Sequence, residues 1–371
     1  MSTKTRTSLL ILAGLCLVSG WFFWPRALGT ARDASGPTPT PRVATQATPR
    51  NEQAERFATT QTPEALRSEI ANLERALAKL PPAEAAAALV DLLDAGVDGR
   101  TGLAFRVGPG GALVSAPTLR VWMLHRLGQL DRLLAAAYAE EIFATGNSPD
   151  EWSVALRNQW REAAPLGEMA AVRERVLEMM HRDEWAESPS AGFLEGLDLA
   201  VASVAWEAVP RLEEWLAPGQ PTALRAAAWL TLDRMVLEAP QDTLAQYAGH
   251  PNWLASQPML RAGVMARANV ENPSERAVVE TYLRRDIPSA EGQRFFELLP
   301  NVSTALSHNL ATPPHVVSAW TAAQRDRATL AVVQGWRTSS AFARWESDLA
   351  AAEERLAESV ASAKRGGYLT P

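Results

Sequence analysis

The stretch 221–238, PTALRAAAWLTLDRMVLE, carries the pattern on which the fold of this chain depends. Its apolar residues recur at spacings of about three and four, which places them on one broad face of a helix. They are Leu224, Ala227, Ala228, Leu230, Leu232, Met235 and Val236. Arg225, Asp233 and Arg234 fall outside this stripe, so we expect them to point outward. The pattern predicts an amphipathic helix that buries one face.

Similar patterns follow one another along the chain, separated by short breaks rich in Pro, Gly or Asn. The first predicted helix begins at Thr62-Pro63-Glu64, which combines an N-cap, a proline and an acid, and ends at Pro81-Pro82. The further predicted helices lie near 83–93, 117–127, 130–145, 149–162, 166–182, 190–204, 206–216, 221–238, 241–248, 256–268, 273–285, 289–298, 301–309, 313–334 and 338–364. Strand-forming runs are too few for a central sheet.

The stretch 103–116 is the exception, because two short β-prone runs flank Gly108–Gly111. It predicts a β-hairpin. A calcium loop beginning at Asp94 would need an acid and a glutamate where Gly96 and Phe105 stand. A phosphate-binding loop at the glycines would need a following Lys-Ser or Lys-Thr pair, which the sequence lacks. We therefore interpret the glycines as a structural turn.

Many short helices joined by short loops are typical of an α-solenoid. The segments AVPRLEEWL (208–216) and ALRAAAWL (223–230) resemble HEAT-like repeats, in which a proline-bent helix precedes an alanine-rich one. The resemblance implies an all-α, irregular solenoid of helical hairpins over 63–366, followed by a tail, 367–371. It also implies a concave interaction surface without chemistry of its own. An irregular helical bundle is the alternative architecture.

The run 8–24, SLLILAGLCLVSGWFFW, contains no charge and would span about 25 Å as a helix. Lys4 and Arg6 precede it, so we expect residues 1–7 in the cytoplasm and the rest of the chain across a single-pass cell membrane, in the periplasm or outside the cell. The predicted membrane-anchor residues are Leu9, Leu10, Ile11, Leu12, Leu15, Leu17, Val18, Trp21, Phe22, Phe23 and Trp24.

A cleaved signal peptide is the alternative, because Ala27 and Gly29 form a small-residue pair that a signal peptidase could recognise. The length of the apolar run and its aromatic end favour an uncleaved anchor. A lipoprotein is excluded because Leu15, which is not small, precedes Cys16. Since Cys16 is the only cysteine, the exported part has no disulfide framework and no thiolate site.

Residues 25–62 are rich in Pro, Thr, Ala and Gln, and they contain a single aromatic side chain, Phe57. Such a composition predicts a disordered linker, because it cannot bury enough apolar surface to offset its ordering entropy. The net charge of the whole chain is −6, whereas residues 1–63 carry +4, so the body is acidic. An acidic body excludes nucleic acid as a partner.

We find no residues with the pattern of a catalytic, cofactor-binding or metal site. His308 and His315 lie on either side of a predicted break, and neither HExxH nor GxSxG occurs. Acidic pairs such as Glu213-Glu214 and Glu353-Glu354 are expected on solvated helix faces. The sequence therefore predicts no enzyme, no cofactor and no small-molecule substrate.

The body contains eleven of the 13 tryptophans, which we expect mainly between helices, although exposed ones could stack on sugars. The leading hypothesis is an exported, membrane-anchored scaffold that contacts the lipid bilayer through 8–24 and binds another envelope protein. A glycan-binding or cell-wall-binding module is the second hypothesis. A hydrolase with buried carboxylates is the third.

Overall fold

The structure, a computed structural model, describes residues 54–57, 62–302 and 310–369, all of which lie in the compact unit Thr48–Pro371. Most of these residues are helical, in 17 α-helices, and the described residues contain one two-stranded antiparallel sheet. The predicted anchor 8–24, residues 1–7 and most of the linker 25–62 lie outside the described residues. The prediction of a disordered linker is wrong at residues 54–57, which are helical and bury Phe57 in the core (4% exposed). Within the described ranges, none of the helices combines the length and apolarity needed to span a bilayer.

The α-helices of the first half are α2 (Pro63–Leu77), α3 (Pro82–Asp94), α4 (Leu119–Leu130), α5 (Arg132–Thr145), α6 (Pro149–Ala163), α7 (Met169–Met180), α8 (Asp183–Glu187), α9 (Ala191–Gly196) and α10 (Asp198–Ala202). Those of the second half are α11 (Val209–Trp215), α12 (Thr222–Glu238), α13 (Pro240–Gly249), α14 (Pro258–Met265), α15 (Pro273–Arg284), α16 (Ser289–Leu298), α17 (Ala319–Arg337) and α18 (Glu346–Arg365). Short 3-10 turns are η1 (Pro109–Gly111), η2 (Ala164–Leu166), η3 (Trp206–Ala208) and η4 (Ser340–Trp345).

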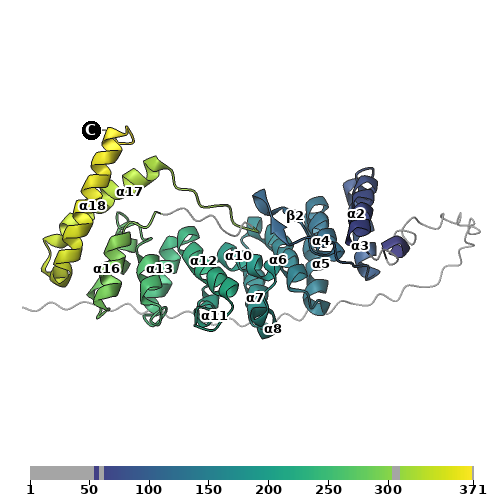
Figure 1. Cartoon of the computed structure of the whole chain (residues 1–371), viewed down its shortest axis with the longest axis horizontal. Coiled ribbons are helices and arrows are strands. Elements are labelled where there is room, and N and C mark those ends of the chain that lie inside the picture. Colours follow the sequence, from purple (N-terminus) through teal and green to yellow (C-terminus); the bar gives the residue numbers. More distant parts are fainter. Residues whose placement is uncertain (1–53, 58–61, 303–309, 370–371) are drawn as a thin grey trace, which may run out of the picture. The chain divides into compact units, whose positions relative to one another are not determined.

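Helices pack mainly against helices that are close to them in the chain. Helix α4 contacts α3, α5 and α6, and α12 contacts α10, α11, α13 and α14. The later helices continue in the same way, with α14 against α16 and α16 against α18. The colours of Figure 1 show this succession, which runs from the blue helices α4 and α5 to the yellow α18. Each amphipathic face is therefore covered by near neighbours in sequence.

Several helix starts follow the predicted capping chemistry. The Thr62 hydroxyl accepts a hydrogen bond from the backbone N–H of Ala65, and Ser148 does the same for Glu151. Some boundaries differ from the prediction. The expected helix 190–204 is divided into α9 and α10, and the sequence analysis missed the short helix α8.

The β-hairpin predicted near 103–116 is confirmed. Strand β1 (Arg106–Val107) pairs with β2 (Leu113–Ser115), with Arg106 opposite Ser115. The connecting Gly110 and Gly111 have φ angles of +65° and +71°, which glycine adopts without the steric cost that other residues pay. The Gly108 N–H donates to the Ala112 carbonyl, so these glycines form the predicted structural turn.

A row of aromatic side chains joins five helices in the core. Phe143, Trp152, Trp185, Phe193 and Trp215 lie in sequence along this row, with successive ring centroids 4.9, 5.5, 6.3 and 5.9 Å apart. They come from α5, α6, α8, α9 and α11. Most contacts are tilted or edge-to-face, the geometry that aromatic pairs prefer. The row ties together elements that are too short to be stable alone.

Packing accounts for many of the tryptophans, as predicted. Trp152, Trp185, Trp215, Trp336 and Trp345 are buried. Two tryptophans of the described body are exposed, namely Trp229 (44%) and Trp320 (59%). The remaining tryptophans of the described body are partly buried.

We expect Trp152→Ala to lower the free energy of unfolding by about 3–5 kcal/mol, because it removes a buried indole and two ring contacts. It also removes the hydrogen bond from the Trp152 Nε1–H to the Gly146 carbonyl. Urea denaturation followed by circular dichroism measures the change. Trp229→Ala is the matched control, and an equal loss in both variants would contradict a stabilising role for the aromatic row.

Candidate functional site

The segment before α17 is extended, and the prediction of a helix over 313–334 is wrong in its first part. Pro313 and Pro314 disfavour helix in the residues before them, and the Ser318 hydroxyl caps α17 by accepting from the Thr321 N–H. The predicted helix 301–309 is also wrong at residues 301 and 302, and the rest of it lies outside the described residues. We call the extended segment 310–317 the strap.

The strap is bound to the side of the helical body by a buried carboxylate. Asp198, at the start of α10, is 1% exposed and accepts hydrogen bonds from the N–H of Ala311 (2.7 Å) and the N–H of Thr312 (2.8 Å). It also accepts the Thr312 hydroxyl at 2.5 Å. Burial raises the pKa of Asp198, and these donors oppose that rise by stabilising the ionised form.

A buried arginine, Arg234, also binds the strap. The Arg234 Nη2 group donates to the Thr312 hydroxyl oxygen and to the Pro313 carbonyl, the latter at 2.8 Å, and it also pairs with Glu238 at 3.1 Å. The Thr312 hydroxyl therefore donates to Asp198 and accepts from Arg234. A hydroxyl is needed at this position, because it bridges a buried anion and a buried cation.

Arg234 and Asp233 were expected to point outward, and this expectation is wrong. Both are buried on α12, where the strap covers Arg234, while Arg267 covers Asp233. The Arg267 guanidinium donates to both Asp233 carboxylate oxygens, at 2.9 and 2.7 Å. Helical periodicity missed this because α12 is covered on more than one side, so its polar residues are buried as well.

The turn of the β-hairpin packs against the first residue of the strap, Leu310. Leu310 is fully buried, and a Cβ atom on Gly111 would stand 2.3 Å from the Leu310 carbonyl oxygen, so only glycine permits this approach. Arg157 Nη1 and Arg161 Nη2 donate to the Gly111 and Gly110 carbonyls at 2.8 and 2.9 Å. Figure 1 shows the yellow-green segment before α17 running back toward β2.

Two clefts lie beside the strap. The first has a volume of 480 Å³ and lies between the hairpin turn and the strap, with Trp160, Pro313 and Pro314 in its wall. The second has a volume of 280 Å³ and lies along the later strap residues, with Arg267, Glu275 and Arg325 among its lining side chains. Space for further contacts is therefore present beside both the earlier and the later residues of the strap.

The residues that the sequence analysis considered for other sites have packing roles. The Asp94 carboxylate accepts the Tyr138 hydroxyl, and the Asp98 carboxylate accepts the Arg120 N–H, so neither is directed at an ion. His308 lies outside the described residues, as do all the predicted anchor residues from Leu9 to Trp24. In the described ranges, His, Cys, Asp and Glu side chains form no group of three that could hold a metal ion.

No family model, curated protein or solved structure that was compared with this chain matches it. The resemblance to HEAT-like repeats therefore stays a prediction. The function has to be argued from the geometry of the strap and its binding site. The sequence contained one signal for this site, the Pro313-Pro314 pair, which breaks a helix but does not indicate where the extended chain is bound.

His125 supports the hairpin from α4 and gives the site a pH dependence. Its Nε2 atom accepts from the backbone N–H of Leu113 at 3.3 Å. Burial, together with the nearby positive charges of Arg157, Arg161 and Arg126, lowers the pKa of His125 to about 3. The folded state therefore requires the neutral imidazole.

Since the unfolded chain protonates this histidine near pH 6.5, its stabilising contribution is complete above that pH and is lost as the pH falls toward 3. We expect the stability of the wild type relative to His125→Gln to fall by about 2 kcal/mol between pH 7 and pH 5. Urea denaturation of both proteins across this range measures it. Parallel stability curves would show that His125 is not buried in its neutral form.

Proposed function

We propose that this chain is an exported, membrane-tethered scaffold whose body is an irregular α-solenoid of the HEAT-like type. The packing of each helix against near neighbours in sequence supports this architecture, because repeat proteins are built from local contacts. Its task is to bind another protein of the cell envelope. The anchor 8–24 holds the body at the membrane, and the linker lets it search for its partner.

The strap carries this proposal. Its hydrogen bonds to Asp198 and Arg234 use backbone groups of the strap as well as the Thr312 hydroxyl. Domains that recognise peptides use the same means, in which main-chain hydrogen bonds give affinity and side-chain pockets give specificity. The body therefore has a surface whose chemistry suits an extended protein segment.

Binding fits the buried charges better than catalysis does. Asp198, Asp233 and Glu291 are all buried, and each meets hydrogen-bond donors or an arginine of the same chain. A general acid or base would have to exchange protons with a substrate in an accessible site. These carboxylates instead hold segments of the chain together.

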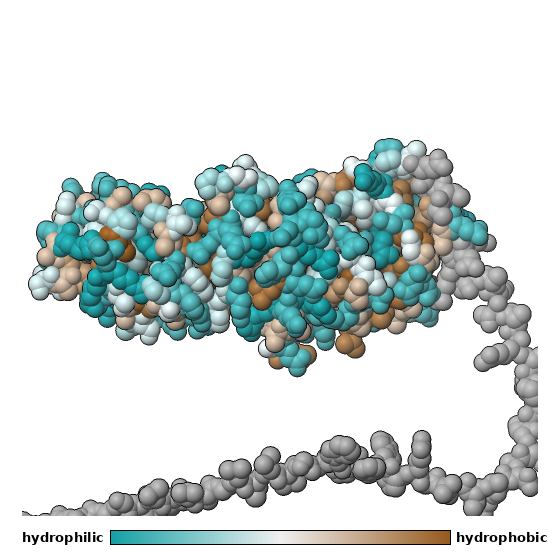
Figure 2. Space-filling model, turned by 90° about the horizontal axis from the view of Figure 1, so that it is seen from below, coloured by the Kyte–Doolittle hydropathy of each residue, from teal (hydrophilic) through white to brown (hydrophobic). Residues whose placement is uncertain are grey.

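Exposed apolar side chains next to the strap extend the proposed contact surface. Val316 is 71% exposed, and Trp320 follows in the first turn of α17. Figure 2 shows the opposite face of the molecule, seen from below Figure 1, where hydrophilic residues predominate. Val316 and Trp320 are two of the exposed large apolar side chains of the described residues, and they lie four positions apart beside the strap, where a partner could use them as anchors.

We expect a photo-crosslinking residue at Val316 to capture one defined envelope protein in cells that express the full chain. The same residue at Leu133, which is equally exposed on α5, is the control and should not capture that protein. Trp320→Glu should reduce the capture at Val316 at least tenfold. Equal capture from both positions, or none at Val316, would contradict the proposed scaffold role.

The tether has its own test. In fractionated cells the full chain should sediment with the membranes and resist extraction by high salt, because an uncharged, mostly apolar run of 17 residues holds it. A chain that lacks residues 1–24 should remain in the cytosol. Release of the full chain by salt, or membrane retention of the truncated chain, would reject the predicted anchor.

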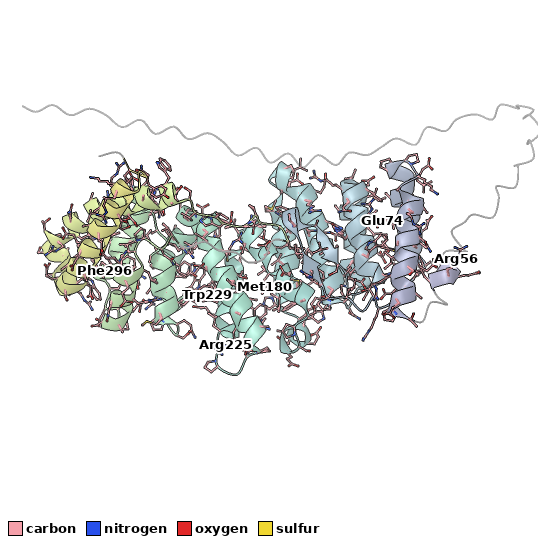
Figure 3. All side chains as sticks on the ribbon, turned by 45° about the horizontal axis from the view of Figure 1, so that its top comes forward. Arg56, Glu74, Met180, Arg225, Trp229 and Phe296 are labelled. Carbon is pink, nitrogen blue, oxygen red and sulfur yellow. The ribbon has the colours of Figure 1, made fainter. Side chains whose placement is uncertain are left out.

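Glycan binding is the second candidate, since Trp229 and Trp320 expose their rings. Figure 3 shows Trp229 on α12, the helix that also bears the exposed Arg225. Sugars stack on such exposed rings. Sedimentation with peptidoglycan or polysaccharide that is lost in Trp229→Ala and Trp320→Ala would favour this candidate over the scaffold.

A further inference from the structure

Asp198 and Arg234, which we call the strap site, bind groups of three consecutive residues, Ala311-Thr312-Pro313. Asp198 requires an N–H on the residue before the threonine, and it binds both the N–H and the hydroxyl of the threonine itself. Arg234 binds that hydroxyl and the proline carbonyl. Pro313 and Pro314, both largely exposed, line the same cleft as Trp160, and grooves with aromatic walls suit proline.

These contacts exclude defined sequences. A proline before the threonine has no N–H and would leave one Asp198 contact unmade. Valine has the shape of threonine but no hydroxyl, so it would separate Asp198 from Arg234 without bridging them. An apolar residue is favoured two positions before the threonine, because Leu310 is fully buried there against Gly111.

The linker of this chain contains sequences that illustrate the rule. Thr38-Pro39 and Thr40-Pro41 each follow a proline, so neither can donate the first N–H. Ala47-Thr48-Pro49 repeats the tripeptide of the strap, but Gln46 stands where the strap has its buried leucine. The strap should therefore bind better than Ala47-Thr48-Pro49. Thr38-Pro39 and Thr40-Pro41 should not bind, because each follows a proline.

Helices outside the strap position both charged groups of the binding site. Asp198 and Arg234 come from α10 and α12, which pack directly against each other. Within the strap, Leu310 and Thr312 are buried, whereas Val316 is largely exposed. A segment from another protein that supplies the same few groups could replace the strap without disturbing the helices.

We propose that the strap is an internal pseudo-ligand and that the partner of this site is an extended protein segment of the form apolar-X-Thr-Pro, in which X is any residue except proline. The strap and the partner segment compete for Asp198 and Arg234. This inference rests on the proposed scaffold function, because it names what the scaffold recognises and what keeps it closed. Binding of the partner requires release of the strap, which lowers the apparent affinity by the fraction of open sites.

The test uses the full chain in detergent micelles and a fluorescent peptide copy of residues 310–318. We expect the chain with Thr312→Val to bind this peptide at least tenfold more tightly than the wild-type chain, because its strap no longer bridges Asp198 and Arg234. Thr281→Val, on the exposed side of α15, is the matched control and should bind as the wild type does. Peptides with Ala311→Pro or Thr312→Val should not bind.

A folded Thr312→Val chain that gains no affinity for the peptide would overturn the proposal and make the strap a fixed part of the fold. A second measurement needs no variant chain. Excess wild-type peptide should speed hydrogen exchange at the amides of Ala311 and Thr312 in the wild-type chain, whereas the Ala311→Pro peptide should not. Unchanged exchange with both peptides would also overturn it.

The two proposals fail in different ways. If the peptide displaces the strap but crosslinking at Val316 captures no envelope protein, the pseudo-ligand stands and the scaffold role falls. If a partner is captured at Val316 while the peptide never competes with the strap, the scaffold role stands and this recognition rule falls.

Discussion

A carboxylate that is removed from water must be surrounded by donors, and Asp198 meets this requirement with groups far along the chain. Its donors are the backbone amides of Ala311 and Thr312, which lie 113 and 114 positions later in the chain, together with the Thr312 hydroxyl. These contacts hold the strap against the body in this structure although it is not helical. The proposed recognition surface is centred on Asp198, with Arg234 beside it.

Other buried charges determine which surfaces of the body meet. Arg267 pairs with Asp233, and Arg261 pairs with the fully buried Glu291 through two hydrogen bonds of 2.6 and 2.8 Å. Buried ion pairs often add little net stability, since desolvation offsets their attraction. A misplaced helix would leave such a charge without its partner, which costs several kcal/mol. These pairs therefore contribute mainly to a unique arrangement of similar helices.

The hairpin and the strap show how a helical body can gain a specific site. Helix surfaces have few free backbone groups, because their amides and carbonyls are used within the helix. The hairpin turn presents the carbonyls of Gly110 and Gly111 to Arg161 and Arg157. The absence of a side chain on Gly111 leaves room for the backbone of Leu310. Irregular segments thus supply the polar backbone contacts, while the helices supply the buried charges.

The sequence by itself determined the helical class, most helix positions, the capping residues and the single hairpin. These features depend on residues that are close in the chain, such as Thr62 with Ala65, or the glycines between β1 and β2. Apolar periodicity also predicted that most tryptophans pack inside. The membrane anchor and the linker before residue 54 remain predictions from sequence alone, whereas burial of Phe57 orders residues 54–57 as a helix.

Only the tertiary structure decided that Asp233 and Arg234 are buried and that residues 310–317 form a bound strap. Their partners lie 34 and nearly 80 residues away, so no local pattern records them. On the sequence, Arg234 resembles any solvated arginine of a helix, and Asp198 resembles any acid in a first turn. Burial by distant segments gives these residues their role, and that burial exists only once the chain has folded.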